Sequence, residues 1–229
     1  MLRDLAEQLA RNRRILRRLP NGVEIYVTPD SQLKYLKGKF DTDLIDLSNK
    51  FVTKNSVVWD IGANCGVFAF SASNVAKKVV AFEADPYLVF LMQESVSINR
   101  QPVTIVPCAI FSGTGLASFS IARRGRASNF LTQAGGNSQT GGERGRILCP
   151  THSLDDLLSW LDPPTLIKID VEGAEVEVLR GGAALFSQHR PVIYFEATDS
   201  TIDLCTEILN GLKYKIEKSI DMNWLATPL

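Results

Sequence analysis

Residues 57–66 read VVWDIGANCG, an apolar run that ends in an acid and is followed at once by a glycine-containing turn. The run Val57-Val58-Trp59 predicts a buried strand, and the stretch from Gly66 to Val75 predicts the helix after it. Glycine at position 62 lets the backbone turn tightly and approach a ligand, which a β-carbon would block. This order of strand, glycine turn and helix is typical of an α/β domain whose ligand lies at the turn.

The same alternation of short apolar strands and helices continues toward the C-terminus. The predicted strands cover residues 57–59, 79–82, 103–106, 166–169, 192–195, 213–218 and 223–226. Helices predicted over 66–75, 86–98 and 174–179 alternate with these strands and indicate a mostly parallel sheet covered on both faces, and right-handed connections make it doubly wound. The last two strands are expected to form an antiparallel pair at the sheet edge. A chain of 229 residues suits one such α/β domain with a seven-stranded sheet.

Two segments fall outside this pattern. Residues 40–229 hold the α/β domain, whereas residues 1–39 are expected to form an amphipathic helix over 2–19 and a short strand over 23–27. The leucine stripe of that helix predicts packing on the domain or on a partner subunit, which leaves a homodimer open. The alternative is a basic helix on a membrane or a phosphorylated substrate. Residues 122–148 are rich in glycine and arginine and predict either a lid or a disordered excursion.

Composition narrows the class of protein. Lysine plus arginine and aspartate plus glutamate both number 25, so no overall charge attracts nucleic acid or an anionic membrane, and neither is expected as a partner. No apolar stretch is long enough for a signal peptide or a membrane span. Four scattered cysteines and two histidines show no zinc-site spacing. These features predict a cytoplasmic protein with reduced thiols.

Four predicted strands end in a carboxylate. These residues are Asp60, Glu83, Asp170 and Glu196. Because ligands of doubly wound sheets bind beyond the carboxyl ends of the strands, four acids at one edge indicate a binding site there.

The first two acids indicate the chemistry of the ligand. Dinucleotide sites use G-x-G-x-x-G and avoid an acid at the position of Asp60, where it would repel a pyrophosphate. An acid suits a ligand with an ammonium group and no phosphate, such as the methionine end of S-adenosylmethionine. Glu83 ends the next strand, where it can accept hydrogen bonds from ribose hydroxyls, or instead interact with the following helix dipole. The predicted cofactor-binding residues are Asp60, Gly62, Ala63, Asn64, Gly66, Glu83, Ala84 and Ala109.

The segment IKIDVEGAE at 167–175 predicts the reacting centre. Asp170 and Glu172 lie where an acceptor nucleophile would meet a methyl donor, and Lys168 would keep one carboxylate ionised. These three are the predicted catalytic residues. Glu172 as a cap of the helix near Gly173 is the structural alternative. No metal is assigned, and a divalent cation between Asp170 and another carboxylate is the weaker option.

Taken together, these motifs resemble the FkbM family of methyltransferases over roughly residues 40–229. The segments that carry the resemblance are DIGANCG (60–66), AFEADP (81–86), IKIDVEGAE (167–175), VLRGG (178–182) and VIYFE (192–196). The resemblance implies a Rossmann-like class I fold, S-adenosylmethionine as cofactor and O-methylation of a small-molecule or glycan hydroxyl. Ala84 departs from the proline that is commoner there. Residues 122–148 match no family motif, so the identity of the acceptor is not carried over.

A neutral hydroxyl attacks a methyl group poorly, so a base must take its proton, and Asp170 or Glu172 is expected to do so. N-methylation remains open. A nicotinamide-dependent oxidoreductase is the alternative enzyme, although Asp60 and the missing G-x-G disfavour it. A binding module without chemistry is disfavoured by the two carboxylates at 170 and 172.

Overall fold

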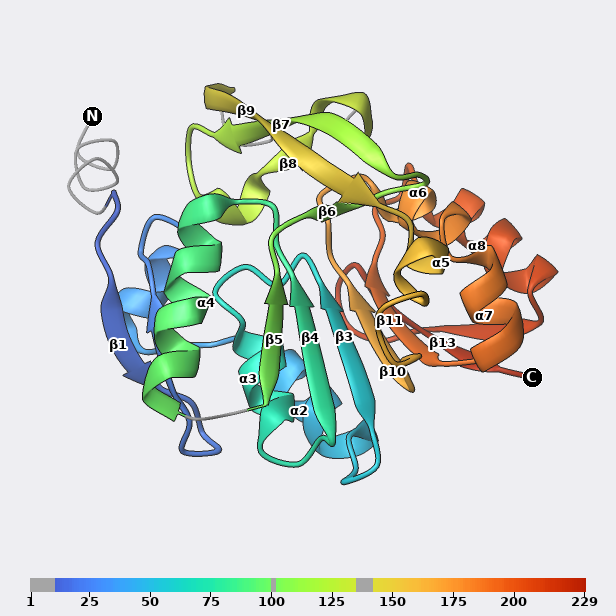
Figure 1. Ribbon diagram of the computed structural model, residues 1–229, viewed down its shortest axis with the longest axis horizontal. Coiled ribbons are helices and arrows are strands. Elements are labelled where there is room, and N and C mark those ends of the chain that lie inside the picture. Colours follow the sequence, from blue (N-terminus) through green and yellow to red (C-terminus); the bar gives the residue numbers. More distant parts are fainter. Residues whose placement is uncertain (1–10, 100–101, 135–141) are drawn as a thin grey trace.

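The computed structural model describes residues 11–99, 102–134 and 142–229, and its centre is a seven-stranded sheet (Figure 1). The strands are β3 (Val57–Ile61), β4 (Lys78–Phe82), β5 (Val103–Val106), β10 (Leu166–Ile169), β11 (Val192–Glu196), β12 (Tyr214–Lys218) and β13 (Asn223–Pro228). Their order across the sheet is β12-β13-β11-β10-β3-β4-β5. Only β13 pairs antiparallel with its neighbours, β11 and β12. The predicted parallel sheet with an antiparallel edge is therefore confirmed.

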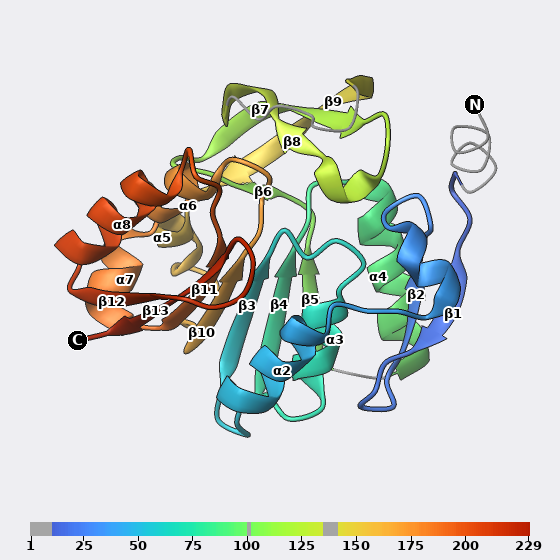
Figure 2. The same cartoon turned by 180° about the vertical axis from the view of Figure 1, so that it is seen from behind.

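Helices cover both faces of this sheet (Figures 1 and 2). One face carries α2 (Thr42–Phe51), α3 (Val67–Ser73) and α4 (Pro86–Asn99), and the other carries α5 (Leu154–Leu157), α6 (Glu175–Arg180), α7 (Ala183–His189) and α8 (Ile202–Gly211). Strand side chains alternate between the two layers, so that every residue of β3 is buried. Burial on both faces explains why the strands read as continuous apolar runs.

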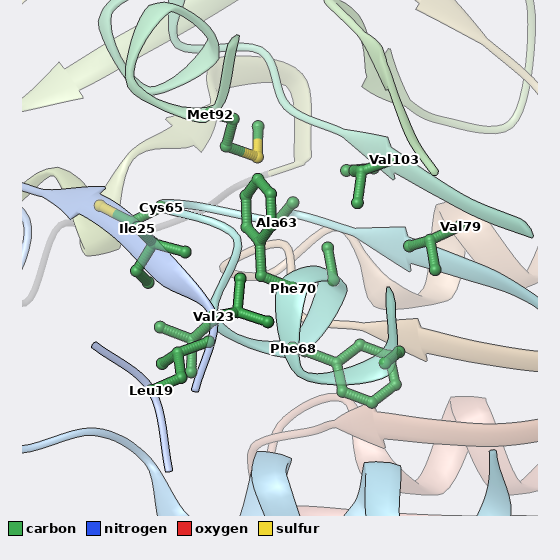
Figure 3. Close-up of a cluster of buried hydrophobic side chains, with 14 of the residues drawn as sticks. Leu19, Val23, Ile25, Ala63, Cys65, Phe68, Phe70, Val79, Met92 and Val103 are labelled. Carbon is green, nitrogen blue, oxygen red and sulfur yellow. The ribbon is translucent and has the colours of Figure 1, made fainter. Parts of the chain in front are cut away.

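The first of these layers is tightly packed. Phe68 and Phe70 of α3 lie among Val79 and Val103 of the sheet and Met92 of α4 (Figure 3). All five are at most 8% exposed. At about 25 cal/mol per Å² of buried apolar surface, side chains of this size contribute roughly 1.5–3 kcal/mol each, which keeps the strand ends rigid.

The order in which strands are added to the sheet reverses at β3, although the strands on either side of it remain parallel. The chain runs outward from β3 through β4 to β5, and then crosses back to β10 and β11 on the other side of β3. The carboxyl ends of β3 and β10 lie side by side, in register from Val58 and Leu166 to Ile61 and Ile169. This point of reversal is where doubly wound sheets bind ligands.

The predicted helix over 2–19 is wrong for its described C-terminal part. β1 (Ile15–Arg18) is a strand that pairs antiparallel with β2 (Glu24–Val27), while residues 1–10 lie outside the described residues. The predicted short strand at 23–27 is confirmed. Tyr26 of β2 donates a backbone hydrogen bond to Ser95 Oγ of α4, so long-range pairing overrides the local helical pattern.

Residues 122–134 and 142–148 are also more regular than the sequence predicts, while residues 135–141 lie outside the described residues. A four-stranded sheet in the order β6-β9-β7-β8 lies over the carboxyl ends of the central strands (Figure 1). Its members are β6 (Ala109–Ile110), β7 (Gly115–Ala122), β8 (Phe130–Leu131) and β9 (Glu143–His152). The prediction of a disordered excursion is therefore wrong for residues 143–148, which belong to β9. Within the described residues, no helix is long and apolar enough to cross a membrane.

Candidate active site

A cavity of about 380 Å³ lies at the carboxyl ends of β3, β4, β10 and β11. Its wall contains nearly all of the residues that the sequence predicts for the site, namely Asp60, Gly62, Ala63, Asn64, Glu83, Ala84, Ala109, Lys168, Asp170 and Glu172. Gly66 is the exception and does not line it. The structure thus brings together residues from four separate segments of the chain.

The turn after β3 requires its glycines. Gly62 has φ +72°, and a Cβ there would lie 1.8 Å from the backbone oxygen of Asp170. Gly66 has φ +81° and would place a Cβ 2.8 Å from the ring of Phe70. A side chain at either position would therefore push the turn away from the sheet. Gly66 acts from outside the cavity, by letting α3 start close to α4.

Glu83 is buried and held by the backbone. Its Oε2 accepts a hydrogen bond of 2.8 Å from the amide of Asn64, and its Oε1 accepts one of 2.8 Å from the amide of Asp85. Burial raises the pKa of Glu83 to about 7, although the two amide hydrogen bonds act in the opposite direction. The residue that caps α4 is Asp85 and not Glu83, because the carboxylate of Asp85 accepts a hydrogen bond from the amide of Tyr87. The remaining lone pairs of Glu83 are free to accept ligand hydroxyl groups in the cavity.

Lys168 joins β10 to the turn and to two carboxylates. Its Nζ donates a hydrogen bond of 2.8 Å to the carbonyl oxygen of Gly62. It also lies 3.4 Å from Oδ1 of Asp60 and 3.3 Å from Oδ2 of Asp170. Burial opposes the charge of Lys168, but Asp170 and Asp60 outweigh it and raise its pKa above the usual value. Lys168 therefore carries a permanent positive charge that positions the turn and both acids.

The partners of Asp60 are Lys168 and a backbone amide of the protein, and not the ligand ammonium group that the sequence suggests. Its side chain is fully buried, with Oδ2 accepting a hydrogen bond of 3.1 Å from the amide of Ala69 in α3 and Oδ1 facing Lys168. Burial raises the pKa of Asp60, while Lys168 and the Ala69 amide lower it. Its contacts make Asp60 a positioning residue for α3 and for Lys168.

Three carboxyl groups form the wall opposite Glu83. Asp170 is 37% exposed, Glu172 is exposed to the cavity and adopts φ +52°, and Glu196 is half-buried. Burial, with the nearby charges of Asp170 and Glu175, raises the pKa of Glu172 to about 8. Burial and Asp170 also raise the pKa of Glu196. This wall attracts cations and accepts protons.

The helix-cap alternative for Glu172 finds no support in its contacts. Oε1 of Glu175 accepts the backbone hydrogen bonds from Val171 and Gly173, at 3.4 and 3.1 Å. Ala174, the N-cap residue of α6, makes no side-chain capping hydrogen bond. Glu172 is thus left facing the cavity.

Sequence reasoning missed the part of the wall that comes from outside the central sheet. Arg126, which lines the cavity, donates to Asp30 at 2.8 Å and also to Asp85. Arg144 donates to both oxygens of Asp30, at 2.8 and 2.7 Å. Burial opposes the ionisation of Asp30, yet Arg144 and Arg126 hold its pKa below the usual value. The upper sheet is anchored over the cavity by these ion pairs, which no local sequence signal links.

The described residues offer no cluster of three or more His, Cys, Asp or Glu side chains arranged to hold a metal ion. The four cysteines are all buried and free.

Residues 60–216 match the family model described as the methyltransferase FkbM domain. The chain belongs to the FkbM methyltransferase family. The chain is 30% identical over 191 residues to the hexuronic acid methyltransferase AglP of Haloferax volcanii, a match that covers 81% of this chain and 74% of that protein. The resemblance seen in the motifs is thereby confirmed.

Two solved structures show the same fold as this FkbM methyltransferase. Methyltransferase FkbM from Methylobacillus flagellatus superimposes with a TM-score of 0.53 at 20% identity, over 76% of this chain and 44% of its own. This chain thus spans less than half the length of that protein. A 16S rRNA N2 G1207 methyltransferase from T. Thermophilus, solved with AdoMet and guanosine, gives 0.55 at 13% identity, over 95% of this chain and 50% of its own.

Family and fold together establish an S-adenosylmethionine-dependent methyltransferase, as the sequence predicts. The oxidoreductase and the binding module without chemistry are set aside by this assignment.

Proposed function

We propose that this enzyme transfers the methyl group of S-adenosylmethionine to a hydroxyl of a sugar or glycan. The observation that carries the proposal is the half-exposed carboxylate of Asp170 beside the glycine turn, with Lys168 behind it. Similarity to a hexuronic acid methyltransferase supports a sugar as the acceptor.

The cavity suits a cationic nucleoside. Glu83 has lone pairs for ribose hydroxyl groups, and the backbone at Gly62 can approach a ligand because it carries no β-carbon. Ala63, Asn64, Ala84 and Ala109 complete the wall beside them. When bound, S-adenosylmethionine supplies an electrophilic methyl group on a positively charged sulfur.

The protein has to hold the acceptor oxygen in line with that methyl group and remove its proton. Asp170 is the proposed base, because its carboxylate reaches the cavity while remaining tied to Lys168. Glu172 accepts a hydrogen bond from a neighbouring hydroxyl group when it is ionised, and donates one to that group when it is protonated. Asp60 and Lys168 act as positioning residues, since both are buried and contact the turn.

The test has two measurements. Calorimetry should show that wild-type protein and Asp170→Asn bind S-adenosylmethionine with similar affinity. With sugar acceptors, the wild type should form S-adenosylhomocysteine and an O-methyl product identified by NMR, whereas Asp170→Asn should lose at least about 100-fold in turnover. Unchanged turnover in Asp170→Asn would remove this residue as the base, and an N-methyl product would refute hydroxyl methylation.

A further inference from the structure

Tyr35 is a buried residue of the cavity wall whose hydroxyl group the proposed chemistry does not use. It lies in the 3₁₀ helix η1 (Leu33–Lys37), is 2% exposed and lines the cavity. Its ring packs against Phe40, with 5.8 Å between the ring centroids. Within the part of the chain that the structure describes, no residue hydrogen-bonds to its hydroxyl group. Buried polar groups are normally paired, so we expect a ligand in the cavity to supply the partner.

The surroundings of this hydroxyl group make it a hydrogen-bond donor. Burial is the main cause that raises the pKa of Tyr35 well above its usual value, and Asp41 and Asp170 of the cavity wall act in the same direction. The hydroxyl group therefore keeps its proton at neutral pH. A ligand group that accepts hydrogen bonds is its natural partner.

The segment that carries Tyr35 is attached to the glycine turn after β3. Ser31 Oγ donates a hydrogen bond of 2.6 Å to Oδ1 of Asn64 in that turn, and Tyr35 belongs to the same buried cluster as Ala63. Because Ser31 occupies Oδ1 of Asn64, the NH₂ group of this side chain is the end left for a ligand. Gln32, the N-cap residue of η1, also lines the cavity. Three uncharged side chains with donor groups thus lie beside the turn.

The amino-acid end of the methyl donor is the part that needs such groups. With the ribose at Glu83 and the methyl group beside Asp170, as in the proposed function, this end lies along the turn from Gly62 to Asn64. It carries a carboxylate, which the acids of the wall would repel. Among the described residues of the wall, the basic side chains are Lys168 and Arg126, and both are already in ion pairs. Uncharged hydrogen-bond donors can bind the carboxylate in their place.

We propose that the hydroxyl group of Tyr35, together with the NH₂ groups of Gln32 and Asn64, binds the carboxylate of S-adenosylmethionine. The inference rests on the placement of the donor in the proposed function, and it adds Gln32 and Tyr35 to the residues that bind the donor. Both precede residues 60–216, which match the family model. The N-terminal segment is therefore part of the donor site.

Calorimetry with two donors that differ in one group tests this contact without an acceptor. Decarboxylated S-adenosylmethionine lacks the carboxylate but keeps the amine and the positive charge at sulfur. Tyr35→Phe removes only the hydroxyl oxygen and keeps the ring that packs on Phe40. It should weaken binding of S-adenosylmethionine by about tenfold and change binding of the decarboxylated donor by less than about twofold. Gln32→Met should likewise weaken binding of S-adenosylmethionine more than binding of the decarboxylated donor.

Tyr214→Phe is the matched control. Tyr214 is also buried, but its hydroxyl group donates to the backbone oxygen of Phe186, at 3.4 Å, and lies away from the cavity wall. This variant should bind both donors as the wild type does. Equal losses for the two donors in Tyr35→Phe, or no loss for either, would overturn the proposal if thermal unfolding shows a folded protein. Failure of the wild type to bind S-adenosylmethionine would instead refute the proposed function.

Discussion

Replacement of Lys168 by methionine should be among the most damaging single substitutions near the site. The Lys168 and Asp60 side chains are only 4% and 0% exposed, and the ammonium group also donates to the Gly62 carbonyl. Removing one partner of a buried ion pair leaves an uncompensated charge and costs about 3–5 kcal/mol. Asp170 adds little to this figure because it is 37% exposed and water screens its charge.

The loss should depend on pH in a defined direction. Burial already raises the pKa of Asp60, and without Lys168 the value should rise further. A carboxyl group whose pKa is higher in the folded than in the unfolded state binds more protons when folded, so stability falls as pH rises. The deficit of Lys168→Met should therefore be largest at high pH and shrink by up to about 1.4 kcal/mol per pH unit below the folded-state pKa of Asp60.

Urea unfolding at several pH values between about 5 and 8 measures both effects. Lys78→Met is the matched control, because Lys78 is also on a central strand but its partner Asp162 is 59% exposed. That substitution should cost less than about 1 kcal/mol. The reasoning would be refuted if Lys168→Met lost no more stability than the control, or if its loss were the same at every pH.

Three further substitutions test the site and the anchor above it. Gly62→Ala should weaken S-adenosylmethionine binding by at least about tenfold in calorimetry, because its Cβ would lie 1.8 Å from a backbone oxygen, whereas Gly113→Ala meets nothing within 4 Å and should bind normally. Glu83→Ala should also lose about tenfold in affinity through the missing carboxylate, and wild-type affinity would remove Glu83 from the site. Arg126→Met leaves two buried carboxylates with one partner fewer and should lower the free energy of unfolding by about 3 kcal/mol; a loss under about 1 kcal/mol would show that the anchor contributes little.

The central sheet could be predicted from the sequence because its signal is local. Strands buried on both faces are largely apolar, as in β3, where Asp60 is the one charged residue, and glycine turns and helices separate them. The predicted strand at 166–169 coincides with β10 for the same reason. Topology then places the acids that end these strands at one edge, so most of the cavity wall follows without knowledge of any side-chain contact.

Elements that depend on distant partners could not be predicted in this way. Residues 15–18 have a helical pattern but become a strand, since β2 pairs with them and packs on α4. β7 and β9 pair across a segment rich in glycine and arginine, and exposed Leu116 beside buried Ala117 obscures the alternation of polar and apolar residues in β7. The pairing of Asp30 with Arg126 and Arg144 was equally hidden, because it joins segments that lie far apart in the chain.

Those pairings explain how so many acids can gather at one site in a stable protein. Lys168 offsets Asp60 and Asp170, backbone amides bind Glu83, and burial raises the pKa of Glu196. Among the described residues of the cavity wall, Lys168 and Arg126 are the basic side chains, and both are already in ion pairs. A pyrophosphate entering this cavity would meet carboxylates with no free cation to receive it, whereas a donor with a positive charge at sulfur would relieve their repulsion. The same arrangement that disfavours a nicotinamide dinucleotide is therefore one that favours a donor with a positive charge at sulfur.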